Sequence, residues 1–372
     1  MVSNNEDNAF INQMKYLKRK KSFLDDTLNL IIAPTLACNF ACPYCYEKDL
    51  PSHIMHHEIQ DQLVSFISSY TNKVKGLCIS WHGGEPLIGY KAIQNILNKI
   101  STSINIPIIR HQMVSNGYLF TKEMCDFFHK SKLDYLQITI DGTKETHNKT
   151  RIHKLGIETY DTIVNNIDMI LSNMPNCKIG IRINIHEENK SIYPSINEEL
   201  KRRWPNENCF VYPAIVVKQG SCKVACLSPT ERAKFYLDLH HNYNLDVNFT
   251  PHLRLGSCDG IYENTYVIDP AGSLYKCWAD IGIKERTIGN LAEGVTNWEF
   301  VAGYMLGSDK FEDPKCLNCK IFPICNGGCN RFRLEKQYNG TSYNVCPVDE
   351  KGLINFLHTI YAQKQGLSYE KI

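Results

Sequence analysis

Two kinds of segment alternate six times between about residues 25 and 220, and this alternation limits the fold more than any other feature. One kind is a short run rich in Val, Ile and Leu, which is typical of a buried parallel strand. The other has apolar residues at helical spacing. Strands that alternate with helices predict right-handed βαβ units and a parallel sheet. Eight such units close a full barrel, so six predict an α/β fold with a partial (β/α)6 barrel. The predicted strands are 28–34, 76–86, 106–117, 133–142, 177–186 and 209–217, and the predicted helices are 56–71, 89–103, 121–131, 159–173 and about 192–203.

The pattern changes beyond about residue 220, where cysteines become frequent and the alternation stops. Residues 258–346 contain seven cysteines, which indicates a domain organised by metal around a small core of its own. Helical spacing returns at 229–242 and 347–364. The predicted organisation is an N-terminal extension at 1–24, the partial barrel at 25–220, a connecting segment at 221–257, a cysteine-rich domain at 258–350, and a C-terminal helix and tail at 351–372.

Composition and charge exclude several classes of function. A formal charge of +2 is too small for a typical nucleic-acid-binding protein, and we interpret the basic run 18–21 as a solvated helix end. The sequence has no run of about 18 or more apolar residues, so no membrane span is predicted, and its N-terminus lacks the apolar core of a signal peptide. We therefore expect a cytoplasmic protein whose 16 cysteines bind metal rather than form disulfides.

Three cysteines follow the first predicted strand at the spacing Cys38-x3-Cys42-x2-Cys45. A [4Fe–4S] cluster needs a ligand on each of its four irons. Three local thiolates would leave one iron open to a chelating substrate. A zinc knuckle that takes its fourth ligand from elsewhere is the alternative interpretation.

The second predicted strand ends in Gly83-Gly84-Glu85-Pro86. Ligands of parallel α/β folds bind at the carboxyl ends of the strands. The two glycines would let a ligand approach the backbone closely. Glu85 offers a carboxylate to an ammonium group, and Pro86 fixes the turn. An ordinary tight turn is the alternative.

Two further strand ends carry polar residues. The third strand ends in Ser115-Asn116-Gly117, and the fourth ends in Asp141-Gly142, with Arg151 shortly after it. A guanidinium is well formed for bidentate binding of a carboxylate. A plain turn at 115–117 and a surface position for Arg151 are the alternatives.

The cysteine loop, with Tyr44 directly before its last cysteine, resembles the signature of the radical S-adenosylmethionine (SAM) superfamily. In that family the amino and carboxylate groups of SAM chelate the open iron, and an electron from the cluster splits SAM to give a 5′-deoxyadenosyl radical. The resemblance implies the following set: Cys38, Cys42 and Cys45 as cluster ligands, Tyr44 beside adenine, Gly83, Gly84, Glu85 and Pro86 around the amino group, Ser115 and Asn116 near the ribose, and Arg151 at the carboxylate.

The later cysteines resemble the SPASM pattern of the same superfamily. Cys258 and Cys277 flank Gly272 at the expected spacing, and Cys316-x2-Cys319-x5-Cys325-x3-Cys329 precedes Cys346. A pair of zinc ribbons is the alternative. The resemblance implies two auxiliary [4Fe–4S] clusters, three clusters in all: the second auxiliary cluster on Cys316, Cys319, Cys325 and Cys346, and the first on Cys258, Cys277 and Cys329.

The fourth ligand of the first auxiliary cluster is not evident. Relatives that mature sulfatases carry a further cysteine shortly after the position of Cys258, and this chain does not. An iron open to substrate is one possibility. Cys222 and Cys226 are candidate ligands, or they are free thiols. The remaining cysteines lie in apolar contexts and are interpreted as core residues: Cys78, Cys125, Cys177 and Cys209.

Proteins with this layout modify side chains of ribosomally made peptides and proteins. One subclass installs thioether, ether or carbon–carbon crosslinks, and the other oxidises a Cys or Ser of a sulfatase to formylglycine. The second subclass places an aspartate directly after the second auxiliary cysteine as proton acceptor. Here Trp278 follows Cys277, and Asp280 is the candidate base. The sequence therefore favours a peptide maturase, with the sulfatase-maturing activity as the alternative.

The resemblance also implies partners. These are a peptide or protein substrate, an electron donor such as flavodoxin or ferredoxin, and a possible leader-recognition partner, because only about 28 residues precede the first strand. An alternative of another class is a non-catalytic, zinc-stabilised binding module. It would explain the Cys-x2-Cys pairs but not the Gly-Gly-Glu-Pro segment at a strand end.

Overall fold

The structure is a computed structural model that describes residues 4–24, 26–47, 50–217, 222–243, 245, 253–256, 258–340, 345–346 and 350–365. The chain divides into two compact units. The barrel unit consists of 25–226 and 264–300, and the second unit consists of 1–24, 227–263 and 301–372. The boundary expected near residue 220 lies close to the break after 226. Residues 264–300, however, pack with the barrel unit instead of the other cysteine-rich segments.

Six parallel strands form the centre of the barrel unit in the order β1 to β6. Their inner residues are almost entirely apolar, and Leu28, Leu30 and Ile32 of β1 are essentially inaccessible to solvent. Five of these strands lie within segments predicted from the sequence, and β1 begins one residue before its predicted segment. Their bounds are β1 (Thr27–Ile32), β2 (Gly76–Trp81), β3 (Ile108–Ser115), β4 (Tyr135–Thr139), β5 (Lys178–Ile185) and β6 (Cys209–Ile215).

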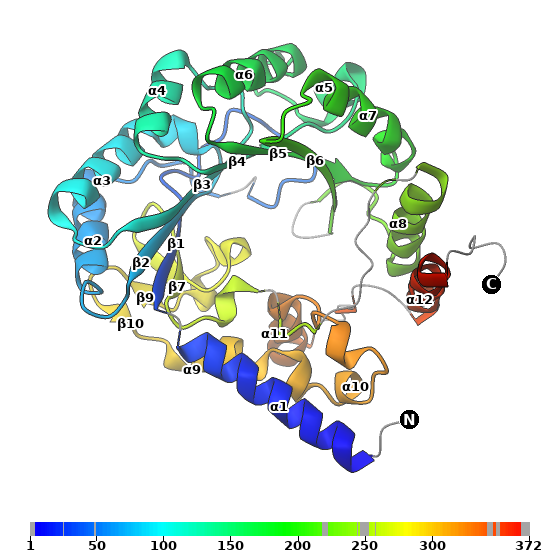
Figure 1. Cartoon of the computed structure of the whole chain (residues 1–372). Helices are drawn as coiled ribbons and strands as arrows, with labels where there is room; N and C mark the ends of the chain where they lie inside the picture. The colour runs from blue at the N-terminus through cyan, green and yellow to red at the C-terminus, as the bar shows by residue number, and fades with distance from the viewer. Residues whose placement is uncertain are drawn as a thin grey trace. The chain divides into compact units, whose positions relative to one another are not determined.

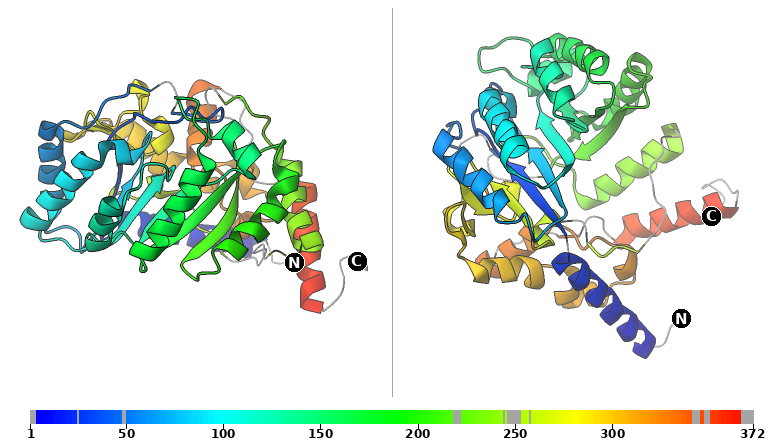
Figure 2. Two further views of the ribbon diagram at one scale, coloured as in Figure 1. Left: turned by 90° about the horizontal axis from the view of Figure 1, so that it is seen from above. Right: turned by 60° about the vertical axis from the view of Figure 1, so that its left-hand side comes forward.

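Helices cover the outer side of this curved sheet, as Figure 1 and the two views of Figure 2 show. Most of these helices bury apolar residues on one face, for example Ile93, Ile96 and Ile100 of α3. The short helix α5 has no apolar residue and buries His147. Thr121 caps α4 by accepting a hydrogen bond from the backbone N–H of Met124 (3.2 Å), as its position before a helix predicts. The helices are α2 (His57–Ser68), α3 (Tyr90–Ser103), α4 (Lys122–Lys130), α5 (Lys144–Thr150), α6 (Tyr160–Asn173) and α7 (Tyr193–Arg203).

Four short strands extend the sheet on the other side of β1. Strand β7 (Thr265–Ile268) runs parallel to β1, and β8 (Ser273–Tyr275), β9 (Gly289–Asn290) and β10 (Gly294–Val295) follow in antiparallel order. This extension was not predicted, because strands of two to four residues are too short to show a period. It covers an edge of β1 that would otherwise expose unpaired backbone groups.

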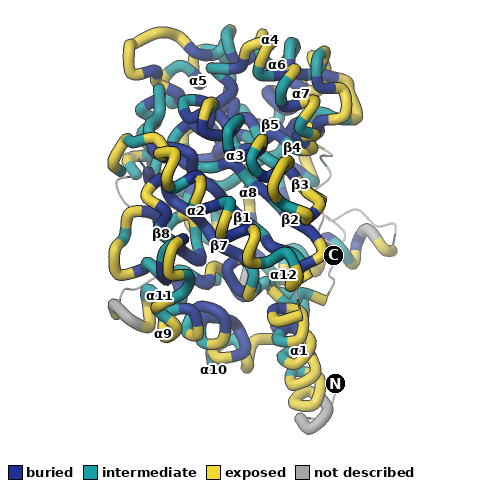
Figure 3. The backbone as a smooth tube through the Cα atoms, turned by 90° about the vertical axis from the view of Figure 1, so that its left-hand side faces the viewer, coloured by how far each residue is buried: buried dark blue, intermediate teal, exposed yellow. Residues whose placement is uncertain are grey.

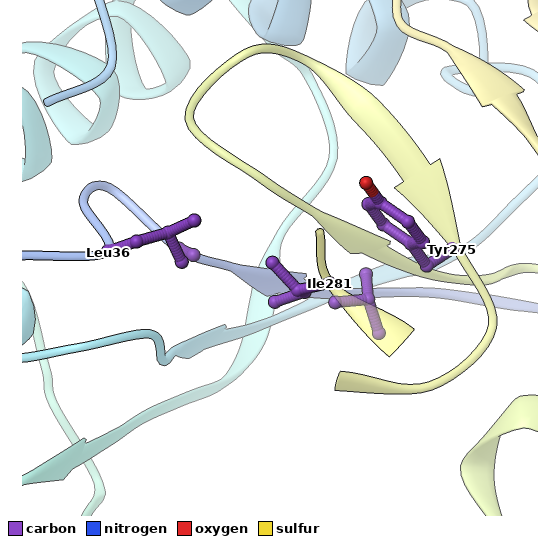
Figure 4. Close-up of a cluster of buried hydrophobic side chains, with 5 residues drawn as sticks. Leu36, Tyr275 and Ile281 are labelled. Atoms are coloured by element: carbon purple, nitrogen blue, oxygen red, sulfur yellow. The ribbon is translucent and has the colours of Figure 1, made fainter. Parts of the chain in front are cut away.

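A buried apolar cluster fixes this extension to the start of the cysteine loop. Figure 4 shows Leu36 of that loop on one side and Tyr275 and Ile281 on the other. Leu36 lies two residues before Cys38, so the cluster helps to set where the loop begins. The cluster consists of Ala33, Leu36, Val267, Tyr275 and Ile281.

The second unit contains α1 (Asn4–Phe23), whose basic end is not solvated as expected. Lys18 is only 2% exposed and forms an ion pair with Asp309. Arg19 donates hydrogen bonds to the carbonyl of Leu306 (2.6 Å) and to Glu312 (2.9 Å). The interpretation of the whole basic run as a solvated helix end was therefore wrong for these two residues. Burial of a charge requires a partner of opposite charge, and that partner lies almost 300 residues away in the sequence.

The remaining helices of the chain are short or pair with one another. Helix α8 (Pro229–Tyr243) packs against α12 (Glu350–Gln365), and the predicted start of α12 at 347–349 lies outside the described residues.

Figure 3 shows the contrast between the buried strands of the barrel unit and the largely exposed surface of α1. Among the described helices, none is long and apolar enough to cross a membrane. The other helices are α9 (Trp298–Ala302), α10 (Pro314–Leu317) and α11 (Asn330–Asn339).

Candidate functional site

The cysteine loop follows the carboxyl end of β1. Its three thiols are buried or partly buried. The N–H of Cys45 donates to the carbonyl of Cys42 (3.2 Å), and the N–H of Phe40 donates to Sγ of Cys38 (3.4 Å). Burial raises the pKa of Cys38 to about 12 and that of Cys45 to about 11. Thiolates in such a place need nearby positive charge. An iron–sulfur cluster supplies that charge, so the donor set fits the group implied by the sequence.

The Gly83-Gly84 pair lies against this loop. A Cβ atom on Gly83, whose φ is +102°, would come within 2.4 Å of the carbonyl oxygen of Thr35, and one on Gly84 within 2.3 Å of that of Ala37. The N–H of Glu85 donates to the same carbonyl of Ala37 (2.8 Å). The close approach expected for a ligand is therefore made by the protein's own cysteine loop, which requires glycine at both positions.

The carboxylate of Glu85 connects the end of β2 with the end of β3. The side chain is fully buried, and Oε1 accepts hydrogen bonds from the hydroxyl of Ser115 (2.9 Å) and the N–H of Leu87 (3.1 Å). Oε2 accepts from the N–H of Asn116 (2.7 Å). Burial raises the pKa of Glu85, and these hydrogen bonds oppose that rise. A carboxylate has about four acceptor positions, so about one remains for a further donor such as an ammonium group.

Tyr44 and Arg151 belong to a second buried network. The Tyr44 hydroxyl donates to Asp141 and accepts from Arg151 and from the amide of Asn184 (3.2 Å each). The guanidinium also lies over the ring of Phe40, 5.2 Å from its centre. Nε of Arg151 is buried without a hydrogen-bond partner among the described residues. An unsatisfied buried donor is costly, so it suits a site completed by an anionic ligand.

The structure therefore brings together most of the residues that the sequence singled out. Ser115 and Asn116 meet at Glu85, and Tyr44 meets Arg151. Sequence reasoning did not assign Asp141 or Asn184 to the site. Asp141 could have been found as a polar residue at a strand end. Asn184 lies within the apolar run of β5, and the only sequence feature that marks it is an amide side chain between two isoleucines.

Cys277 and its neighbours lie in the barrel unit. Trp278 is 43% exposed, and its ring is tilted against that of His82 at 5.8 Å between centres. Asp280 is fully buried and pairs with Arg286 at 3.3 Å. Its role as a base stays a prediction.

The other auxiliary cysteines lie in the second unit, where basic side chains hold the loops that bear them. Nη2 of Arg333 donates to Sγ of Cys316 (3.1 Å) and to the carbonyl of Gly327 (2.5 Å). The Lys310 ammonium donates to the carbonyl of Cys325 (2.9 Å). Burial raises the pKa of Cys316, and the adjacent guanidinium lowers it. Charge-assisted contacts of this kind are typical around iron–sulfur ligands.

Three other cysteines are less enclosed. Cys319 and Cys329 are exposed and Cys346 is partly buried. Within the described ranges, no three His, Cys, Asp or Glu side chains converge on the position of a single metal ion. The cysteines of a [4Fe–4S] cluster are distributed over four irons, so this finding concerns mononuclear sites only.

Comparison with known proteins identifies the core of this site. A sequence model of the radical SAM superfamily matches residues 32–193, a range that contains the cysteine loop, Glu85, Asn116 and Arg151. The chain carries a radical SAM domain. It is therefore an enzyme, and the interpretation as a non-catalytic zinc module is set aside. The family implies SAM and one [4Fe–4S] cluster as cofactors of this radical SAM enzyme.

The relatives of this radical SAM enzyme include anaerobic sulfatase-maturating enzymes. The cysteine-type enzyme of Clostridium perfringens (strain 13) is 23% identical over 354 residues, which cover 85% of this chain and 92% of the relative. The serine-type enzyme of Bacteroides thetaiotaomicron is 31% identical over 157 residues, 38% of this chain and 36% of the relative.

Solved structures share the fold. Native anSMEcpe with bound AdoMet and the Cp18Cys peptide has a TM-score of 0.69 at 18% identity and covers 91% of this chain and 97% of its own. Streptococcus suis SuiB bound to S-adenosylmethionine has a TM-score of 0.59 at 18% identity, with 94% and 84% covered. The partial-barrel fold predicted from the sequence is confirmed.

Proposed function

We propose that this radical SAM enzyme is a SPASM-type maturase that crosslinks side chains of a ribosomally made peptide. The bound cluster and SAM would supply a radical that abstracts hydrogen from an unactivated C–H bond. The observation that carries the assignment is the attachment of the cysteine loop to the Gly-Gly-Glu-Pro turn, with Glu85 linking this turn to the end of β3. Peptide as the substrate class is supported by neighbours of the same fold, which were solved with the Cp18Cys peptide and with the precursor peptide SuiA.

In this proposal Glu85 and Arg151 hold the two ends of the amino acid part of SAM. The remaining acceptor position of Glu85 would take the ammonium group, because three of about four positions are already used. The free Nε of Arg151 would donate to the carboxylate. Tyr44 would act through its hydroxyl, which orients the guanidinium, as well as through its ring.

The proposal also includes the two auxiliary clusters on the cysteines named above. The contact of Arg333 with Cys316 supports the second of these, since it would place positive charge beside a coordinating sulfur. The ligands proposed for the first are Cys258, Cys277 and Cys329.

Two observations favour crosslinking over formylglycine formation. The position directly after Cys277 holds Trp278, which has no proton-accepting group. Asp280 is fully buried, and its Oδ1 lies 3.3 Å from Nη1 of Arg286. A base must come within hydrogen-bonding reach of the substrate proton, and full burial opposes this.

The second candidate function is sulfatase maturation. It is favoured by the similarity to the Clostridium perfringens enzyme, which extends over 92% of that relative. In that case Asp280 would be the proton acceptor, and its pairing with Arg286 would have to open during turnover.

Mass spectrometry after single turnovers distinguishes the two candidates. The gene neighbourhood is first searched for a small precursor peptide. The reconstituted enzyme is then incubated anaerobically with SAM, reductant and either such a precursor peptide or a sulfatase-derived peptide with the target cysteine. Crosslinking predicts 5′-deoxyadenosine above the peptide-free level and a product that has lost two hydrogens. A sulfatase-derived peptide converted to an aldehyde, with no response to the precursor, would establish the second function instead.

A further inference from the structure

A short loop beside the cysteine loop exposes three aliphatic side chains. Ile152 is 41%, Leu155 is 77% and Ile157 is 50% exposed. We call residues 152–157 the aliphatic loop. Single exposed apolar residues need no explanation, but three within six positions form a patch, and such patches mark interaction sites.

The aliphatic loop is held in place by the residues on its inner side. His153 is 8% exposed, and its Nδ1 accepts a hydrogen bond from the N–H of Leu155 (3.1 Å). The hydroxyl of Thr159 donates to the carbonyl of Arg151 (2.9 Å), just before the loop. Gly156, at φ +71°, makes the turn that L residues avoid. The aliphatic side chains therefore point to solvent from a fixed backbone.

The loop is hydrogen-bonded directly to the cysteine loop. The N–H of Ala41 donates to the carbonyl of Ile152 (2.8 Å), and the N–H of Lys154 donates to the carbonyl of Asn39 (2.9 Å). Phe40 and His153 form an antiparallel bridge between these bonds. Residues 39–41 connect Cys38 to Cys42. The aliphatic loop is therefore hydrogen-bonded to the segment that joins two proposed cluster ligands.

Lysines and carboxylates both lie near the patch, and the carboxylates of Glu158 and Asp161 are paired with a lysine. Lys149 and Lys154 are exposed, and neither forms an ion pair with the described residues, whereas nearby Lys144 pairs with Asp161 and with Glu158 (3.5 Å). An apolar centre with lysines beside it complements a small acidic partner. Weak electron-transfer complexes use small interfaces of this kind.

We propose that the aliphatic loop is the docking surface for a small acidic one-electron carrier, of the flavodoxin or ferredoxin class, that reduces the cluster of this radical SAM enzyme. The carrier would give up one electron and the cluster would gain it, with no bond formed or broken. The proposal rests on the radical SAM domain and is independent of the peptide substrate proposed above. Docking here would bring the donor next to the segment that holds Cys38 and Cys42.

The test compares two reductants on two variants. Leu155→Glu places a charge in the centre of the patch. Ile109→Glu is the matched control, because Ile109 is 58% exposed and lies near the amino end of β3, whereas the cysteine loop follows the carboxyl end of parallel β1. Stopped-flow absorbance follows the oxidation of reduced flavodoxin by the reconstituted holoenzyme, and dithionite serves as a small reductant that needs no docking surface.

We expect Leu155→Glu to lower the second-order rate constant with flavodoxin at least tenfold and to leave reduction by dithionite unchanged. Ile109→Glu should resemble the wild type with both. The double variant Lys149→Glu/Lys154→Glu should also slow the flavodoxin reaction and flatten its dependence on ionic strength.

Other outcomes would overturn the assignment. Equal loss with both reductants would mean that the loop only shapes the cluster site. A raised KM for the peptide with unchanged electron transfer would make it a substrate surface, and a change of oligomeric mass in Leu155→Glu would make it a self-association surface. Failure of the peptide proposal would appear separately, as a wild-type enzyme that flavodoxin reduces but that gives no peptide-dependent 5′-deoxyadenosine.

Discussion

Replacement of Gly84 by alanine tests the attachment of the strand-end turn to the cysteine loop. The new Cβ would lie 2.3 Å from the carbonyl oxygen of Ala37 and 2.5 Å from that of Leu36. Both neighbours are backbone atoms, which cannot rotate away as a side chain can. One of the two segments must therefore move, and the hydrogen bond from Glu85 to Ala37 would lengthen or break.

The expected cost follows from these two effects. Forced overpacking of a well-packed site costs about 1–3 kcal/mol, and loss of one backbone hydrogen bond costs about 0.5–1.5 kcal/mol. We therefore expect Gly84→Ala to lower the free energy of unfolding of the barrel unit by about 2–4 kcal/mol. That is a large part of the ~5–15 kcal/mol that stabilises a typical domain.

Urea unfolding followed by circular dichroism measures this change, and iron analysis after reconstitution measures its effect on the cysteine loop. Gly307→Ala is the matched control, because a Cβ there meets nothing within 4 Å and the backbone has no positive φ. The control should change stability by less than about 0.5 kcal/mol. Wild-type stability and full iron content in Gly84→Ala would refute the claim that the cysteine loop requires glycine at this position.

Three further predictions concern other parts of the chain. With the three proposed clusters, Cys42→Ala should abolish SAM cleavage and reduce iron from about twelve to about eight per chain, measured by 5′-deoxyadenosine release and iron analysis, and full cleavage would exclude Cys42 as a ligand. Arg333→Met should weaken iron retention at Cys316 about 10- to 100-fold under a chelator, with Arg333→Lys intermediate, and equal retention would remove Arg333 from the site. Burial lowers the pKa of His147 to about 3, below its ordinary value of 6.5, so its neutral form contributes stability that is complete above about pH 6.5 and is lost as pH falls toward 3. Urea unfolding at several pH values should therefore show a flatter acid dependence for His147→Gln, by about 1.4 kcal/mol per unit of pKa shift, and an unchanged dependence would contradict this reasoning.

The barrel could be predicted from the sequence because most of its elements are long enough to show a period, whereas α5, with seven residues, was not predicted. Strand β5 has eight residues and α6 has fourteen, and both lie within their predicted segments. The pairing of β7 with β1 could not be predicted, because β7 has four residues and its partner lies more than 230 positions earlier. Parallel pairing at such a distance leaves no local signal.

The site was predictable to the extent that its residues follow strands. Glu85 and Asn116 were found in that way. The partners of Tyr44 were not, since its contact with Asn184 joins positions 140 residues apart. The inward position of Lys18 was missed for the same reason, because its partner Asp309 belongs to a distant segment.

The place of β7 in the sheet has a consequence for how the protein is made. Strand β1 lies between β2 and β7, so its neighbour on one side leaves the ribosome only after residue 268 has been added. At about 5–20 residues per second, the nascent chain waits about 3 to 11 seconds between completing β6 and receiving that neighbour. During this interval β1 can pair with strands of other chains, and a fragment that ends at residue 226 would stay in that state permanently. We therefore expect such a fragment to aggregate on expression, even though it contains every residue assigned here to the binding of SAM.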